Sequence, residues 1–124
     1  MIYTLFFSHR REMDPDTMAE YESRFAKLKR CATDEYPGFV DTKSFTADDG
    51  ERLTIVRFRD EESQRAWSRD ALHREAQQKG RTDYYERYRI VVCQAMRSYD
   101  WERQPIEPAT SSAEDQAPRK ETAA

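Results

Sequence analysis

Residues 39–59 carry the sequence FVDTKSFTADDGERLTIVRFR, and this stretch decides the fold. Two segments rich in β-branched and aromatic residues, 39–46 and 51–59, flank the dipeptide Asp49-Gly50. An Asp-Gly pair between two such segments is a strong signal for a β-hairpin. The middle of the chain is therefore predicted to form two antiparallel strands.

The residues before this hairpin predict a strand followed by a helix. Residues 2–8 are β-branched and aromatic and favour a strand. Asp14-Pro15 then supplies an N-cap and a first-turn proline, and Pro37-Gly38 ends the helix. Between them, one apolar stripe recurs at three- and four-residue steps to about residue 34, through Met18, Tyr21, Phe25, Leu28 and Ala32.

The residues after the hairpin repeat this order. Asp60 is the expected N-cap of a second helix, which bends near Leu72 and ends at Gly80 as its C-cap. Residues 82–85 open one further short turn, and residues 88–99 form the last strand. The order β-α-β-β-α-β predicts an α+β, ferredoxin-like domain with a four-stranded antiparallel sheet.

The first and last strands are apolar on both faces. In residues 2–8, Tyr3, Leu5 and Phe7 alternate with Ile2 and Phe6. An antiparallel sheet with helices on one face should show apolar residues on that face only. A second copy of the chain is the simplest cover for the other face, so we expect a homodimer through the sheet face.

Composition limits the remaining possibilities. The 124 residues include 21 Lys and Arg against 24 Asp and Glu, a net charge of −3, which argues against a nucleic-acid binder. All fifteen aromatic residues precede residue 102, so residues 1–101 are the predicted domain and residues 102–124 a disordered tail. There is no run of about 20 apolar residues to cross a membrane, no leader signal, and no cysteine spacing for a disulfide or metal site. A cytoplasmic location is expected.

These features together carry a family resemblance. The chain resembles the antibiotic biosynthesis monooxygenase domain, whose ferredoxin-like protomers pair into a dimeric α/β barrel. The matching residues are Tyr36-Pro37-Gly38-Phe39-Val40, Asp60-Glu61-Glu62-Ser63 with Trp67, His73-Arg74-Glu75-Ala76-Gln77, Gly80-Arg81, Tyr84-Tyr85 and Tyr88-Arg89. The resemblance covers about residues 1–101.

The resemblance implies an oxidoreductase that inserts oxygen into aromatic polyketides, quinols or haem, often without metal or flavin. In the anthrone-oxidising branch, Trp67 matches the pocket Trp, His73 stands at the Tyr position and Ser63 at the Asn position. In the haem-degrading branch, the haem-ligating His position holds Gln77, and the chain contains no Asn for the first strand. These differences disfavour haem as a cofactor, so we expect none.

Cofactor-free oxygenation needs an apolar pocket, a proton acceptor and donors for a developing oxyanion. His73 is the best general base, because its ordinary pKa of about 6.5 suits proton transfer near neutrality. It lies four residues from Gln77, so the two share a helix face. The predicted catalytic residues are His73 and Trp67, and the predicted substrate-binding residues are Ser63, Gln77, Phe7 (or Phe6), Tyr85 and Tyr88, with no metal ligand.

Structural roles compete with these assignments. The aromatic residues also suit a plain core, and His73 also suits a structural hydrogen bond. Asp83 is a second possible base or a cap, and Arg81 and Arg89 are possible holders of an anionic substrate group. Cys93 is expected to be buried and inert.

The predicted function is a cofactor-independent monooxygenase that uses molecular oxygen on a small aromatic, quinol or polyketide-like molecule. The alternatives are a non-catalytic dimeric module that binds a small ligand and, less favoured, a haem-binding or haem-degrading protein.

Overall fold

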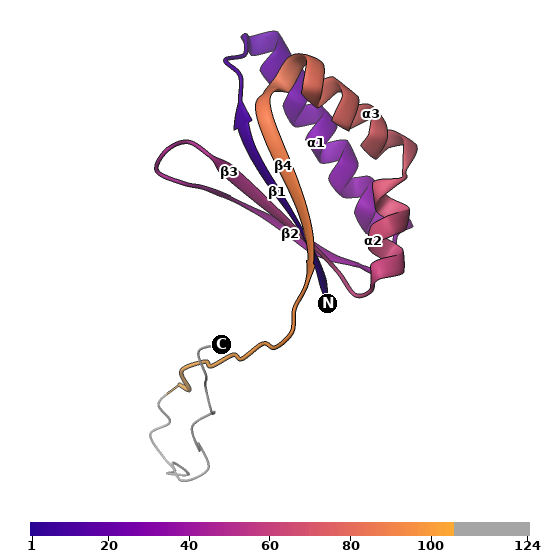
Figure 1. The fold of residues 1–124 in the computed structure, drawn as a ribbon, viewed down its shortest axis with the longest axis vertical. Coiled ribbons are helices and arrows are strands. Elements are labelled where there is room, and N and C mark those ends of the chain that lie inside the picture. The colour runs from indigo at the N-terminus through magenta and orange to yellow at the C-terminus, as the bar shows by residue number, and fades with distance from the viewer. Residues whose placement is uncertain (106–124) are drawn as a thin grey trace. The chain divides into compact units, whose positions relative to one another are not determined.

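The computed structural model describes residues 1–105 of the chain. Its elements follow the predicted order, with the second helix divided into two and followed by a short π-helix (Figure 1). They are β1 (Ile2–Arg10), α1 (Pro15–Glu35), β2 (Phe39–Thr46), β3 (Arg52–Phe58), α2 (Glu61–Ser68), α3 (Ala71–Lys79), η1 (Gly80–Tyr84) and β4 (Tyr85–Gln94).

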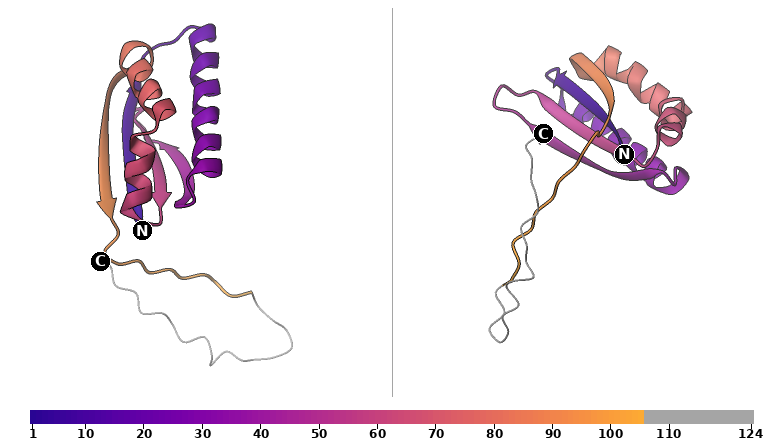
Figure 2. Two further views of the ribbon diagram at one scale, coloured as in Figure 1. Left: turned by 90° about the vertical axis from the view of Figure 1, so that its right-hand side faces the viewer. Right: turned by 60° about the horizontal axis from the view of Figure 1, so that its bottom comes forward.

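The four strands form one sheet in the order β2-β3-β1-β4, and every neighbouring pair is antiparallel. The hairpin between β2 and β3 forms as the Asp49-Gly50 pair predicts, with Gly50 at φ 91°. The helices lie on one face of this sheet (Figures 1 and 2). The structure thus has the α+β, ferredoxin-like fold that the sequence predicts.

The helix boundaries follow local capping. The Asp14 side chain accepts a hydrogen bond from the Thr17 N–H at 2.7 Å and begins α1. Asp60 does the same for the Ser63 N–H at 2.7 Å and begins α2. A carboxylate at this position satisfies a backbone donor that the helix leaves free and interacts favourably with its dipole.

Gly80 is the C-cap of α3, as the sequence predicts, but its φ of −58° and ψ of −44° are right-handed, so the chain continues into η1 instead of reversing there. The predicted ends of the last strand are wrong. The last strand begins at Tyr85 and ends at Gln94, not at 88 and 99. It ends there because Gln94 pairs with Ile2, the first residue of β1, beyond which no neighbouring strand remains.

The sheet has an inner face under the helices and an outer face opposite them. On the inner face, Phe58 is fully buried and forms the core with Ile2, Ala32 and Trp67. The registers place Tyr3, Leu5 and Phe7 of β1 on the outer face with Ile55 of β3. Apolar residues therefore occupy both faces, as the sequence indicates.

Residues Met1–Gln94 form one compact unit. Residues 95–105 contain no helix or strand. The rest of the predicted tail, 106–124, lies outside the described residues. None of the described helices is long and apolar enough to cross a membrane.

Candidate active site

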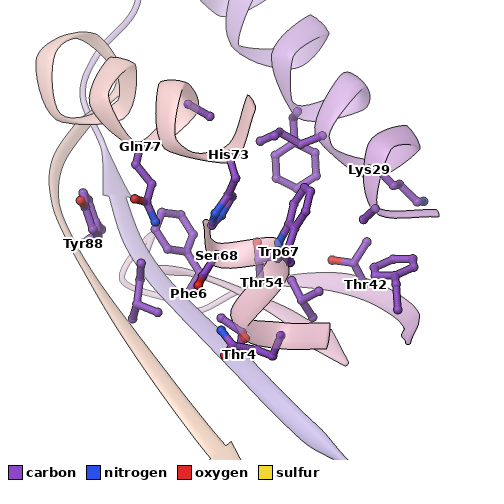
Figure 3. Close-up of a pocket in the computed structure, with 18 of the residues that line it drawn as sticks. Thr4, Phe6, Lys29, Thr42, Thr54, Trp67, Ser68, His73, Gln77 and Tyr88 are labelled. Carbon is purple, nitrogen blue, oxygen red and sulfur yellow. The ribbon is translucent and has the colours of Figure 1, made fainter. Parts of the chain in front are cut away.

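A cavity of about 170 Å³ lies between the inner face of the sheet and the helices (Figure 3). The sheet contributes Thr4, Phe6, Phe39, Thr42, Thr54, Val56, Tyr85, Tyr88 and Ile90, α1 contributes Phe25, Leu28, Lys29 and Ala32, and the α2–α3 segment contributes Gln64, Trp67, Ser68, His73, Ala76 and Gln77. No Asp or Glu is among these lining residues. The cavity is thus an apolar, aromatic space with a few polar groups, the usual character of a small-molecule site.

Trp67 and His73 form one wall of this cavity as a stacked pair. Their ring centroids are 4.8 Å apart and their planes differ by 29° (Figure 3). Residues six apart would lie about 120° apart around a continuous helix, because an α-helix turns 3.6 residues per turn. The break between α2 and α3 removes that separation and brings the two rings together.

Asp70 holds this break in place. Its Oδ1 accepts the Leu72 N–H at 2.8 Å and so caps α3, while its Oδ2 accepts the Tyr36 hydroxyl at 2.6 Å. The Tyr36 ring meets Trp67 edge-on, with centroids 5.5 Å apart. The Tyr36 hydroxyl lowers the pKa of the Asp70 carboxyl, and the same hydrogen bond, with burial, raises the pKa of Tyr36 to about 12.

His73 carries a buried nitrogen that has no partner. Its Nδ1 makes no hydrogen bond within residues 1–105, and the same is true of the Thr4 hydroxyl across the cavity. Burial lowers the pKa of His73, and the Ser68 backbone and the Asp70 carboxylate oppose this only in part. The imidazole is therefore neutral near pH 7, with a nitrogen able to accept a proton.

Three aromatic rings form the cavity wall at the β1–β4 side. The Phe6 ring lies 5.3 Å from Tyr85 and 5.4 Å from Tyr88, centroid to centroid. The Tyr85 hydroxyl donates to the Tyr21 hydroxyl at 3.4 Å, and burial raises the pKa of Tyr85. This wall is therefore aromatic and closely packed.

The structure brings five of the seven predicted site residues to the cavity: Trp67, His73, Gln77, Tyr85 and Tyr88. Placing Phe7 at the cavity is wrong, because strand alternation turns it to the outer face and turns Phe6 inward. Placing Ser63 there is wrong too, because its hydroxyl packs against the backbone at Gly38. The next residue along α2, Gln64, lines the cavity instead.

Sequence reasoning missed the inward-facing hydroxyl residues. Thr4, Thr42 and Thr54 all line the cavity from the sheet. Because side chains alternate between the two faces of a strand, these threonines could have been identified once Phe6, and not Phe7, was known to face the helices. The choice was ambiguous because both faces of the sheet are apolar.

The other candidates take structural positions. Asp83 pairs with Lys79 at 2.8 Å. The Arg89 guanidinium lies 4.6 Å from the centroid of the Phe7 ring on the outer face. The expectation that Cys93 is buried is wrong, because its register places it on the outer face of β4, which no described helix covers, and Cys93 is exposed. Within residues 1–105, no group of three His, Cys, Asp or Glu side chains is placed to hold a metal ion.

Fold and site together define an α+β protein with an aromatic small-molecule cavity between its two layers. The profile of the family described as antibiotic biosynthesis monooxygenase matches residues 9–79, more than half of the chain. The chain belongs to the antibiotic biosynthesis monooxygenase family.

Solved structures share this fold. A variant of SnoaB from Streptomyces nogalater, described as a cofactor-independent oxygenase, is 16% identical with a TM-score of 0.63, over 78% of this chain and 94% of its own. Rv0793 from Mycobacterium tuberculosis is 10% identical with a TM-score of 0.63, over 80% and 98%. A conserved protein from Methanosarcina mazei is 14% identical with a TM-score of 0.60, over 75% and 90%. No curated protein matches the sequence.

Proposed function

We propose that this protein is a cofactor-independent monooxygenase that oxidises an aromatic, quinol or polyketide-like substrate in the cavity with molecular oxygen. The observation that carries the proposal is the buried, unpartnered Nδ1 of a neutral His73 in an aromatic cavity wall. Family membership and the description of SnoaB as a cofactor-independent oxygenase support it.

The substrate supplies all the electrons in this chemistry. For a methylene group activated by flanking aromatic rings and carbonyls, the balance is that one methylene and one molecule of oxygen give one carbonyl and one molecule of water. His73 takes a proton from the activated carbon, and the resulting carbanion passes electrons to oxygen and forms a carbon–oxygen bond. Loss of water from the peroxide that results leaves the carbonyl product. The protein contributes a base, orientation and exclusion of bulk water.

The other lining residues orient the ring system. Trp67 stacks behind His73 and presents its indole to a planar ligand. Gln77 and Tyr88 place polar groups at one end of the cavity, and the Tyr85 ring closes the wall. Ser63 and Phe7 have no part in this proposal, because neither lines the cavity.

We also propose that the protein works as a homodimer joined through the outer face of the sheet. That face carries a row of half-buried apolar side chains on β1 and β3, where Leu5 pairs with Ile55 and Phe7 with Leu53. Contiguous apolar surfaces of this kind mark protein interfaces.

A non-catalytic ligand-binding module remains the second candidate, since the same cavity would hold a ligand without turning it over. Haem is disfavoured, because Gln77 stands where a haem-ligating His is expected and an amide is a poor iron ligand.

The test measures oxygen consumption with anthrone and with a hydroquinone panel. His73→Gln should reduce kcat/KM by about 10²–10⁴, the usual contribution of a general base. In the wild type, kcat/KM should fall as pH drops through the lowered pKa of His73, with an inflection below the ordinary value of about 6.5. His9→Gln is the matched control, because His9 lies beside Glu51 and does not line the cavity.

Trp67→Phe should weaken substrate use without removing the base. Oxygen consumption that is the same in wild type and His73→Gln would contradict the proposal. Thermal stabilisation by a substrate with no product formed would favour the binding module instead.

A further inference from the structure

We infer that Arg81, Tyr88 and Gln77 form a subsite for a carboxylate at one end of the cavity, so the substrate carries an anionic group remote from the carbon that faces His73. The inference rests on the proposed function only in treating the ligand as a substrate. The arrangement of the three side chains would be the same for a ligand that the protein binds without converting it.

The hydroxyl of Tyr88 is the centre of this subsite. Arg81 Nη1 donates to it at 2.8 Å. The hydroxyl oxygen is thus the acceptor in this pair, which leaves its own proton free for a further acceptor. A phenol that accepts from a guanidinium is also a stronger donor than an isolated one, because hydrogen bonds in a chain polarise one another.

Gln77 supplies a second donor beside it. Gln77 lies four residues before Arg81, so the two follow one side of the α3–η1 segment. Its side chain and that of Tyr88 both line the cavity and lie in Figure 3 on the side away from Lys29 and Thr42. No hydrogen bond of the Gln77 amide occurs within the described residues, so its N–H groups are available to a ligand.

Arg81 does not itself line the cavity: its side chain is exposed and reaches the cavity end through the Tyr88 hydroxyl, and its charge is not neutralised. No carboxylate lies within 4.0 Å of Arg81 in the described part of the chain, and no Asp or Glu lines the cavity. The neighbouring Lys79, by contrast, contacts both Asp83 and Glu20. A guanidinium presents several N–H donors in a planar fork that suits a carboxylate.

Arg89, the other arginine considered for binding an anionic group, is not placed to contact a ligand in the cavity. The Arg89 guanidinium stacks over Phe7 on the outer face of the sheet, on the side opposite to the cavity. Of the two arginines that the sequence offers for an anionic group, the structure therefore selects Arg81.

The test compares two isosteric probes, 2-naphthoate and 2-naphthamide, by isothermal titration calorimetry with the full chain. Wild type should bind the naphthoate about tenfold more tightly than the amide, as one charge-assisted contact provides. Arg81→Met should remove that preference and leave naphthamide affinity unchanged. Arg81→Lys should retain part of it, and Tyr88→Phe should reduce it.

Arg89→Met is the control, because it removes the same charge on the other face. Equal affinity for the two probes in the wild type would overturn the inference, as would an equal loss in Arg81→Met and Arg89→Met. If oxygen consumption depends on His73 while the probes bind equally, the proposed function stands and the subsite is wrong. If neither probe binds, both the subsite and the aromatic-ligand cavity are contradicted.

Discussion

At the scale of single residues, Gly80 lies where the backbone passes close to the Tyr85 ring of the cavity wall. A Cβ at this position would come within 2.9 Å of the Cδ2 and Cε2 atoms of the Tyr85 ring. The ring has little room to move, because it also packs against Phe6 and Tyr21. This close approach explains the glycine, since the backbone there is right-handed and any residue can adopt it.

Gly80→Ala should therefore reduce the free energy of unfolding by about 1–3 kcal/mol, as overpacking does. Chemical denaturation measures the loss. In a Tyr85→Leu background the ring is absent, so the same substitution should cost much less. An equal cost in both backgrounds would show that the strain arises elsewhere.

His73 shows why burial matters at this scale. An exposed histidine is partly charged near pH 6.5. Burial lowers the pKa of His73, so its imidazole stays neutral to a lower pH. The same desolvation that favours the neutral base also leaves its Nδ1 without a solvent partner. The side chain is thus a neutral imidazole with an unpartnered nitrogen at the cavity wall.

At the scale of elements, the joint between α2 and α3 determines the site. Its parts are the Asp70 carboxylate, the Tyr36 hydroxyl and the Trp67 ring. Through them, the C-terminal end of α1 positions a helix that is distant in sequence. A shift at Asp70 would move His73 relative to Trp67, because Asp70 caps the helix that carries His73.

Tyr36→Phe should lower the free energy of unfolding by about 1–2 kcal/mol, because a hydrogen bond to a charged group contributes more than an ordinary one and Asp70 is only partly buried. Asp70→Asn should also destabilise, and the double variant should lose less than the sum of the two, because the substitutions remove one shared interaction. Tyr99→Phe is the matched control, since Tyr99 is 48% exposed. Strict additivity would contradict the coupling.

The pH dependence of this pair follows from its pKa shifts. The folded pKa of Asp70 is lowered, so its contribution to stability is present above the unfolded value of about 3.9 and is lost as pH falls through the folded value. The pKa of Tyr36 is raised to about 12, so its contribution to stability is fully present below about pH 10 and is lost as pH rises from there through about 12. The difference between wild type and Tyr36→Phe should shrink at both extremes.

At the scale of the whole molecule, the outer face of the sheet carries a group of half-buried apolar side chains. Leu5, Ile55 and Val91 lie side by side across β1, β3 and β4. Charged groups occur there too, in the ion pair between Arg57 and Asp41. An apolar centre with polar groups beside it is typical of a protein interface.

Leu5→Glu should convert the proposed dimer to a monomer, because it places a charge in the centre of the apolar row. Light scattering with size-exclusion chromatography should give twice the chain mass for the wild type and the chain mass for the variant. Leu72→Glu is the control, because Leu72 is 43% exposed on α3, among the helices. A wild type that elutes at the mass of one chain would contradict the homodimer.

Much of this fold is predictable from local signals. Asp14 and Asp60 cap their helices, and Asp49-Gly50 forms its turn, because each acts on backbone groups a few residues away. The C-terminal end of β4 was not predictable from its own residues. It depends on where β1 begins, which is a contact between opposite ends of the domain.

The sequence by itself determined the order and type of the elements, the family, and the presence of Trp67, His73, Gln77 and two tyrosines as site candidates. Only the tertiary structure decided which side chains meet. Strand pairing selected Phe6 over Phe7, helix phase and packing selected Gln64 over Ser63, and the joint at Asp70 stacked His73 on Trp67. The physical reason is that capping and turn formation involve near neighbours, whereas a cavity wall is assembled from residues whose spacing depends on how separate elements pack.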